Sequence, residues 1–125
     1  MKRILIADTE PYVLRVLRMS LENEGYAVEV CANGREALDS IQHEPPDALI
    51  TEVQMSFMDG EELCRNIEQS IPGRVFPIFL LTSRTEIEHR EWSRTIGNLH
   101  FLEKPVSIRE LTTKLATGFV MRSAS

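Results

Sequence analysis

The chain has 125 residues, of which 42% are hydrophobic and 26% are charged, a balance typical of a soluble globular protein with one core. Its 14 basic and 19 acidic side chains give a net charge of −5, which argues against a broad nucleic-acid-binding surface. No segment approaches the ~20 apolar residues of a membrane span, and the first apolar run is too short for a signal peptide. We therefore expect one cytoplasmic domain over residues 1–122 with a loose tail at 123–125, and the sequence leaves open whether the chain is a fragment of a longer protein.

Short apolar runs alternate with amphipathic segments, which predicts βα units and a parallel sheet. In chain order, the expected strands cover residues 3–8, 27–31, 48–53, 77–82 and 99–103. The expected helices run from Pro11 to before Gly25, through Ala37, Leu38 and Ile41 to Pro45-Pro46, from Asp59, from Thr85 to before Gly97, and from Ser107 through Leu111, Leu115 and Phe119. Three of these helices begin with a capping box, formed by Asp59 and Glu62, Thr85 and Glu88, and Ser107 and Glu110.

The fourth predicted helix differs from the others because it is densely charged and has few large apolar residues. Its charge pattern is typical of a solvated helix. A sharper alternative is an interaction surface, in which Trp92 would be partly exposed, since aromatic side chains are enriched at interfaces.

Four predicted strands have a polar residue at or next to their carboxyl end. These residues are Asp8, Glu52, Thr82 and Lys104. The carboxyl ends of parallel strands meet at one edge of an open sheet, where ligands bind and chemistry takes place. The sequence therefore predicts a polar site at this edge. A simpler alternative is that these side chains are only solvated or cap the following helices.

Three stretches in this order, residues 4–11, 55–60 and 104–105, resemble the receiver domain of bacterial two-component response regulators. The resemblance covers nearly the whole chain. It implies an α/β fold of the flavodoxin-like receiver type, with a doubly wound five-stranded parallel sheet in the strand order 2-1-3-4-5. It also implies a signalling module in a phosphorelay.

The resemblance assigns roles to residues at the expected site. Asp8 and Thr9 match the acidic pair that holds Mg²⁺ in the family, and Glu52 matches the aspartate that is phosphorylated and also binds the metal. The backbone carbonyl of Gln54 matches the remaining protein ligand.

Three further residues match the family's switch. Thr82 matches the hydroxyl residue that turns toward the phosphoryl group, and Lys104 the lysine that pairs with it. Phe101 matches an aromatic residue that swings between outward and inward rotamers, and Pro105 a proline that commonly follows a cis bond.

The chain departs from the family pattern at Thr9, Glu52 and Ser56. Thr9 puts a neutral hydroxyl where the direct metal ligand stands, so we expect a weak or absent Mg²⁺ site. Glu52 carries its carboxylate roughly 1.5 Å further out than an aspartate would, and we expect it to form an ion pair with Lys104. Ser56 replaces a proline and leaves its loop less rigid in the unfolded chain.

These departures predict an atypical receiver that acts by protein–protein interaction without phosphorylation at Glu52. The alternative is a working phosphoacceptor with Mg²⁺-dependent self-phosphorylation at Glu52 or another site. The resemblance implies docking through the fourth helix, fifth strand and fifth helix, with a histidine kinase as one partner. We expect no activity on small molecules and no direct contact with nucleic acid. Cys31 and Cys64 are expected to be buried in a reducing compartment.

Overall fold

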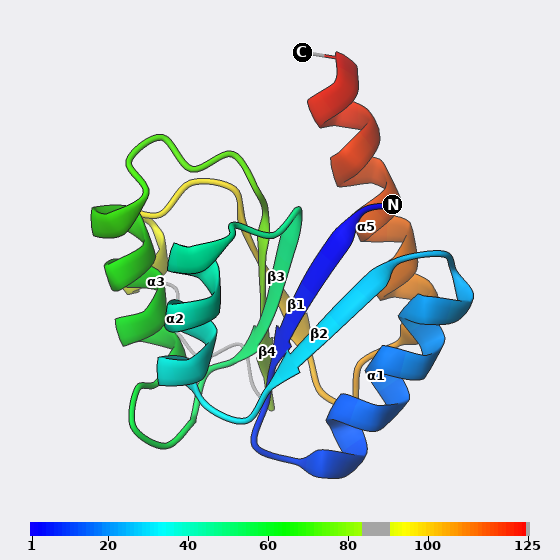
Figure 1. Ribbon diagram of the computed structural model, residues 1–125, viewed down its shortest axis with the longest axis horizontal. Coiled ribbons are helices and arrows are strands. Elements are labelled where there is room, and N and C mark those ends of the chain that lie inside the picture. Colours follow the sequence, from blue (N-terminus) through cyan, green and yellow to red (C-terminus); the bar gives the residue numbers. More distant parts are fainter. Residues whose placement is uncertain (84–90, 125) are drawn as a thin grey trace.

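The computed structural model describes residues 1–83 and 91–124. Its centre is a parallel sheet of five strands in the order β2-β1-β3-β4-β5, which confirms the predicted order (Figure 1). The strands are β1 (Arg3–Ala7), β2 (Ala27–Cys31), β3 (Ala48–Glu52), β4 (Ile78–Thr82) and β5 (Leu99–Glu103). Asp8 and Val53, predicted as the last residues of the first and third strands, and Pro77, predicted as the first of the fourth, each lie one residue outside their strand.

Helices cover both faces of the sheet in the described part of the chain. They are α1 (Pro11–Asn23), α2 (Gly34–His43), α3 (Gly60–Ser70) and α5 (Ile108–Ala124). Figure 1 shows α2 and α3 on one face and α1 and α5 on the other. Helix α5 runs to Ala124, so residues 123 and 124, predicted as part of a loose tail, continue the helix. None of the helices in the described ranges is long and apolar enough to cross a bilayer.

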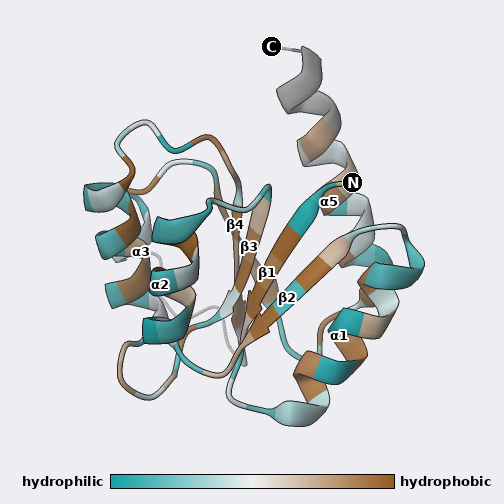
Figure 2. Ribbon diagram, in the orientation of Figure 1, coloured by the Kyte–Doolittle hydropathy of each residue, from teal (hydrophilic) through white to brown (hydrophobic). Residues whose placement is uncertain are grey.

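The sheet separates two apolar clusters, because successive side chains of a strand point to opposite faces. Leu5, Leu49 and Leu80 belong to the cluster under α2 and α3. Ile4 and Ile50 belong to the cluster under α1 and α5. Figure 2 shows the resulting concentration of apolar residues in the central strands. Both faces are covered, which is why these strands read as continuous apolar runs.

Helices α3 and α5 begin with the caps that the sequence predicts. Asp59 accepts a hydrogen bond from the backbone N–H of Glu62 at 2.8 Å, and Ser107 accepts one from Glu110 at 3.2 Å. Asn33, predicted only as part of a turn, caps α2 by accepting from the backbone N–H of Glu36 at 2.9 Å.

The first half of the fourth predicted helix, residues 85–90, lies outside the described ranges together with the Thr85–Glu88 capping box. Residues 91–93 are helical. The partial exposure of Trp92 that the alternative of an interaction surface predicts is wrong, because its side chain is buried in the cluster under α2 and α3. The indole of Trp92 contributes to the core together with Ile96.

Two glycines allow the loop between β3 and α3 to lie against its neighbours. A Cβ atom at Gly34 would stand 2.2 Å from the carbonyl oxygen of Met58, and one at Gly60 would stand 2.7 Å from that of Glu52 and 2.9 Å from the Cα of Val53. Only a residue without a side chain fits at either point. The two glycines therefore fix the path of the chain that follows Glu52.

Candidate functional site

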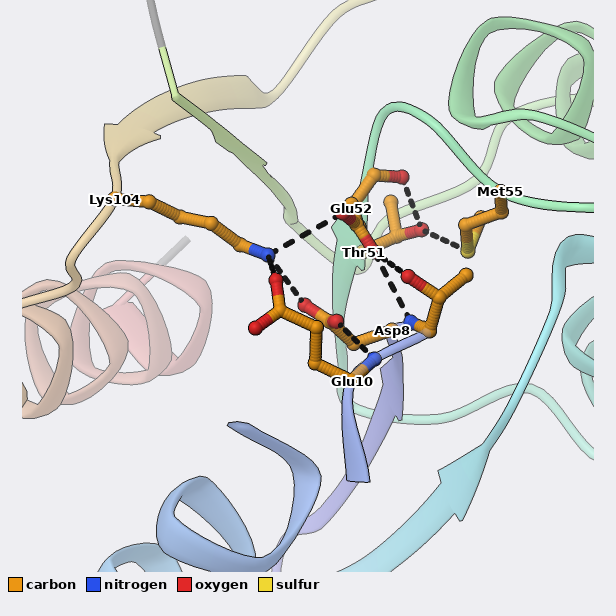
Figure 3. Close-up of polar contacts among 7 residues, drawn as sticks. Asp8, Glu10, Thr51, Glu52, Met55 and Lys104 are labelled. Carbon is orange, nitrogen blue, oxygen red and sulfur yellow. Dashed lines mark hydrogen bonds and ion pairs between the residues drawn. The ribbon is translucent and has the colours of Figure 1, made fainter. Parts of the chain in front are cut away.

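The carboxyl edge of the sheet brings the predicted site residues together. Asp8 follows β1 directly, Glu52 and Thr82 are the last residues of β3 and β4, and Lys104 follows β5. The strand register aligns these ends, since Glu52 pairs with Leu81. Figure 3 shows Lys104 reaching across the sheet edge toward Asp8 and Glu52.

Glu52 is held by the β1–α1 loop and by Lys104. Its Oε2 accepts hydrogen bonds from the backbone N–H of Thr9 at 3.0 Å and from the Thr9 hydroxyl at 2.9 Å. Its Oε1 lies 3.3 Å from the Lys104 ammonium, so the predicted ion pair is present. Both carboxylate oxygens of Glu52 are therefore engaged by the protein.

Lys104 contacts three carboxylates, not one. Its Nζ lies 3.0 Å from Oδ2 of Asp8 and 3.4 Å from Oε1 of Glu10, in addition to the Glu52 contact. Sequence reasoning did not assign a role to Glu10, because the resemblance places the second acidic position at Thr9. The acidic run around Asp8 was the available signal. The Lys104–Pro105 peptide bond is cis, as the resemblance implies.

The pKa values of Asp8 and Glu52 are shifted in opposite directions, although both carboxyl groups lie in the same pocket. Burial raises the pKa of Asp8, and the neighbouring Glu52 carboxylate raises it further. The Glu10 backbone N–H and Lys104 lower it, but the net pKa stays above its usual value. Burial would also raise the pKa of Glu52, but the Thr9 N–H, the Asp8 carboxyl, the Thr9 hydroxyl and Lys104 together hold it below its usual value. The first proton taken up by the pair therefore goes to Asp8.

The same carboxylates raise the pKa of the Lys104 ammonium, although burial alone would lower it. Lys104 is thus a stable cation at neutral pH. An ammonium fixed among carboxylates neutralises part of their charge.

The remaining predicted residues lie around the site formed by Asp8, Glu52 and Lys104. Gln54 and Thr82 line a polar pocket of about 200 Å³ together with Glu52 and Lys104. Phe101 is half-buried and packs against the cluster under α2 and α3. The structure brings Gln54 and Thr82 to the site, and their switch and ligand roles stay predictions.

The carboxylates fit a hard divalent cation such as Mg²⁺. Asp8, Glu10 and Glu52 each offer an oxygen, and these oxygens lie within 4.8 Å of one another. Oδ2 of Asp8 is buried, and within residues 1–83 and 91–124 it faces the Lys104 ammonium at 3.0 Å. Mg²⁺ prefers such oxygen ligands. A bound cation would neutralise the carboxylates and the charge of a phosphoryl group beside them.

The opposite pKa directions predict opposite effects of two neutral substitutions. The stability that depends on Glu52 is present above the unfolded glutamate pKa of ~4.3 and is lost as the pH falls through its lower folded pKa. Asp8 with its raised pKa favours the folded state below ~3.9, and this contribution is lost as the pH rises through the folded pKa. At pH 7, we expect Glu52→Gln to destabilise the protein by about 1–3 kcal/mol.

We expect Asp8→Asn to stabilise the protein at pH 7 by about 1 kcal/mol. Urea unfolding of both variants at pH 7 and pH 4 measures these effects, and both differences should shrink toward pH 4. Equal signs for the two substitutions would contradict the assignment of the first proton to Asp8.

The doubly wound sheet and the carboxylate–lysine pocket at its carboxyl edge place the chain among doubly wound α/β proteins with a charged site at the strand ends. A family model described as "Response regulator receiver domain" matches residues 4–116. The chain therefore belongs to the response regulator receiver family.

Relatives and solved structures agree with this assignment. The chain is 38% identical over 113 residues to response regulator MprA of Mycolicibacterium vanbaalenii, covering 90% of this chain and 48% of that protein. It thus spans about half the length of the curated relatives it matches. The structure of chemotaxis protein CheY4 of Vibrio cholerae superposes with a TM-score of 0.85 at 29% identity, covering 94% of this chain and 98% of that one. A putative response regulator from Chloroflexus aurantiacus gives a TM-score of 0.84 at 31% identity, covering 95% and 98%.

Proposed function

We propose that this receiver acts by protein–protein interaction and is not phosphorylated at Glu52. The observation that carries the proposal is the engagement of both Glu52 oxygens, Oε2 by Thr9 and Oε1 by Lys104. An acceptor carboxylate must present a free oxygen in line with the phosphoryl donor. A misplacement of about 1 Å can cost such a reaction about 100-fold.

Thr9 supports the proposal in a second way. In the resemblance, its position belongs to an acidic metal ligand, but here its N–H and hydroxyl both donate to Glu52. An aspartate at this position would instead repel Glu52. The two departures from the family pattern are therefore partners in one contact, which replaces part of the metal site with an internal hydrogen-bonded pair.

The fixed negative charge at Glu52 takes the place of a switchable phosphoryl group. A carboxylate carries −1, less than the ≈ −1.5 to −2 of a phosphoryl group, so the mimicry is partial. Phe101 lies on the edge strand β5 and packs against the core, and His100 and Glu103 of the same strand are exposed. We propose the fourth helix, β5 and α5 as the docking surface, with a histidine kinase as one partner.

The proposed role is that of a binding module in two-component signalling, not of an enzyme acting on small molecules. The negative net charge of −5 supports a protein partner over direct binding to nucleic acid. Cys31 and Cys64 are both buried free thiols, in keeping with the reducing cytoplasm as the place of action.

The test is incubation of the purified protein with acetyl phosphate and Mg²⁺, followed by intact-mass spectrometry. We expect no gain of a phosphoryl group by the native chain. The variant carrying both Thr9→Asp and Glu52→Asp should gain one, and each single variant should gain less, because the two positions share one site. A stoichiometric gain by the native chain that Glu52→Gln abolishes would overturn the proposal.

One observation favours the alternative of a working phosphoacceptor. Three carboxylate oxygens lie within 4.8 Å of one another, and such a set can hold the Mg²⁺ that the reaction uses. A phosphoryl gain by the native chain that survives Glu52→Gln would establish another acceptor. Peptide mapping would then identify the modified residue.

A further inference from the structure

A second hollow, an apolar cavity of about 440 Å³, lies between α1 and the segment that joins β5 to α5. Its apolar walls come from α1, β4 and residues 105–108, and are formed by Val13, Val16, Leu17, Leu81, Val106 and Ile108. Most of these side chains are only half-buried, so the cavity is open to solvent. Cavities at the lower end of about 300–1,000 Å³ that are mostly apolar and have a few polar groups are typical of sites for small molecules.

The cavity adjoins the acidic site at one end. Glu10, Leu81 and Lys104 line both this cavity and the polar pocket beside Glu52. The Lys104 ammonium is directed at Asp8 and Glu52, at 3.0 and 3.3 Å, and lies 3.4 Å from Glu10. One ammonium thus faces three carboxylates (Figure 3), and this end of the cavity keeps an excess of negative charge.

Glu10 is the carboxylate that a molecule in the cavity can reach. Its side chain is 60% exposed and makes no capping hydrogen bond to α1, so it can turn toward a ligand at little cost. Asp8 is fully buried, and Glu52 already accepts two hydrogen bonds from Thr9. Charge complementarity therefore selects a ligand with an apolar body and a positively charged head, and disfavours an anion.

We propose that this cavity binds a small alkylamine or arylalkylamine, with its apolar body between α1 and residues 105–108 and its ammonium beside Glu10. The ligand gives Glu10 a partner other than Lys104, so binding weakens the Glu10–Lys104 contact and leaves the lysine to Asp8 and Glu52. Occupancy of the cavity is in this way transmitted to the acidic site. The inference does not depend on whether Glu52 accepts a phosphoryl group.

NMR titration of the chain with hexylamine tests this proposal, with butylamine, hexanol and hexanoate as comparisons. Hexylamine should bind about tenfold more tightly than butylamine, because it buries two more methylene groups. It should bind about threefold more tightly than hexanol, which lacks the charge, and hexanoate should bind most weakly of the six-carbon probes. The shifts should change at residues 12–17 and 104–108, and also at Glu52.

Two substitutions with matched controls locate the site. Val16→Trp fills the cavity and should weaken hexylamine binding by about tenfold or more, whereas Met19→Trp adds the same ring at an exposed position of α1 outside the cavity and should leave it within about twofold. Glu10→Gln should weaken hexylamine binding by about threefold and leave hexanol within about twofold. Glu22→Gln removes an equal charge near the far end of α1 and should change neither by more than about twofold.

Circular dichroism checks that each variant is folded, and if Val16→Trp is not, the comparison of butylamine with hexylamine decides. Equal affinities of hexylamine and hexanoate would overturn the ammonium position at Glu10. Equal affinities of butylamine and hexylamine, or an affinity unchanged in folded Val16→Trp, would overturn the cavity as the site. Shifts at residues 12–17 that follow the protein concentration instead of the amine would assign this face to a second copy of the chain and would also overturn the proposal.

Discussion

Replacing Arg74 by methionine is expected to lower the free energy of unfolding by about 3 kcal/mol. The Arg74 side chain is only 3% exposed and lies 3.0 Å from Glu68. Its guanidinium also donates to the carbonyl oxygens of Phe76 and Gly97. These bonds join the segment before β4 to the segment before β5. Methionine fills a similar volume but leaves two carbonyl groups without their donor.

Urea unfolding of three variants measures this effect. Arg74→Lys should recover only part of the loss, because one ammonium cannot reproduce the planar fork of a guanidinium. Arg65→Met is the matched control, since Arg65 makes an exposed pair with Glu61 on α3. It should change the stability by about 0.5 kcal/mol or less. A similar small loss for Arg74→Met would show that the two carbonyl groups find water instead.

Replacing Gly34 by alanine is expected to destabilise the protein by about 2 kcal/mol, within the ordinary range for overpacking. The new Cβ atom would stand 2.2 Å from the carbonyl oxygen of Met58, and this neighbour is backbone, which cannot rotate away. Either α2 or the loop that follows Glu52 must therefore move. Alanine's better helix propensity offsets only part of the cost.

Gly118→Ala is the matched control, and its effect should have the opposite sign. The new Cβ would meet only a Pro77 side-chain carbon at 3.9 Å, and alanine favours the interior of α5 by about 0.5–1 kcal/mol. Chemical denaturation gives both values, and NMR shifts report whether the loop after Glu52 moves. If Gly34→Ala and the native chain have the same unfolding midpoint in denaturant, Met58 does not hold the loop against α2.

The strands and their polar ends were predictable because both signals are local. Residues 48–50 are all apolar, since both faces of their strand are covered, and the strand ends at Glu52, where the sheet meets solvent. The position of each end then follows from the parallel register. The resemblance supplied the strand order, which a local pattern does not contain.

The errors concern contacts between segments that are distant in the sequence. The burial of Trp92 depends on how its helical turn sits against the sheet, and the charge pattern around it carries no information on that angle. The approach of Glu10 to Lys104 joins residues 94 positions apart. Glu10 directly precedes α1, and its acidity alone did not distinguish it from a solvated residue.

The hydrogen bonds between Thr9 and Glu52 couple the two substitutions, because each residue contacts the other. In an ancestor with an aspartate at both positions 9 and 52, a change to glutamate at position 52 alone would bring two carboxylates close together. Changing only the first would leave a hydroxyl whose present partner, Oε2 of Glu52, would be absent. Each residue is therefore favourable only in the presence of the other. Such epistasis works against reversion by single substitutions, so a lineage that acquires the pair tends to keep it.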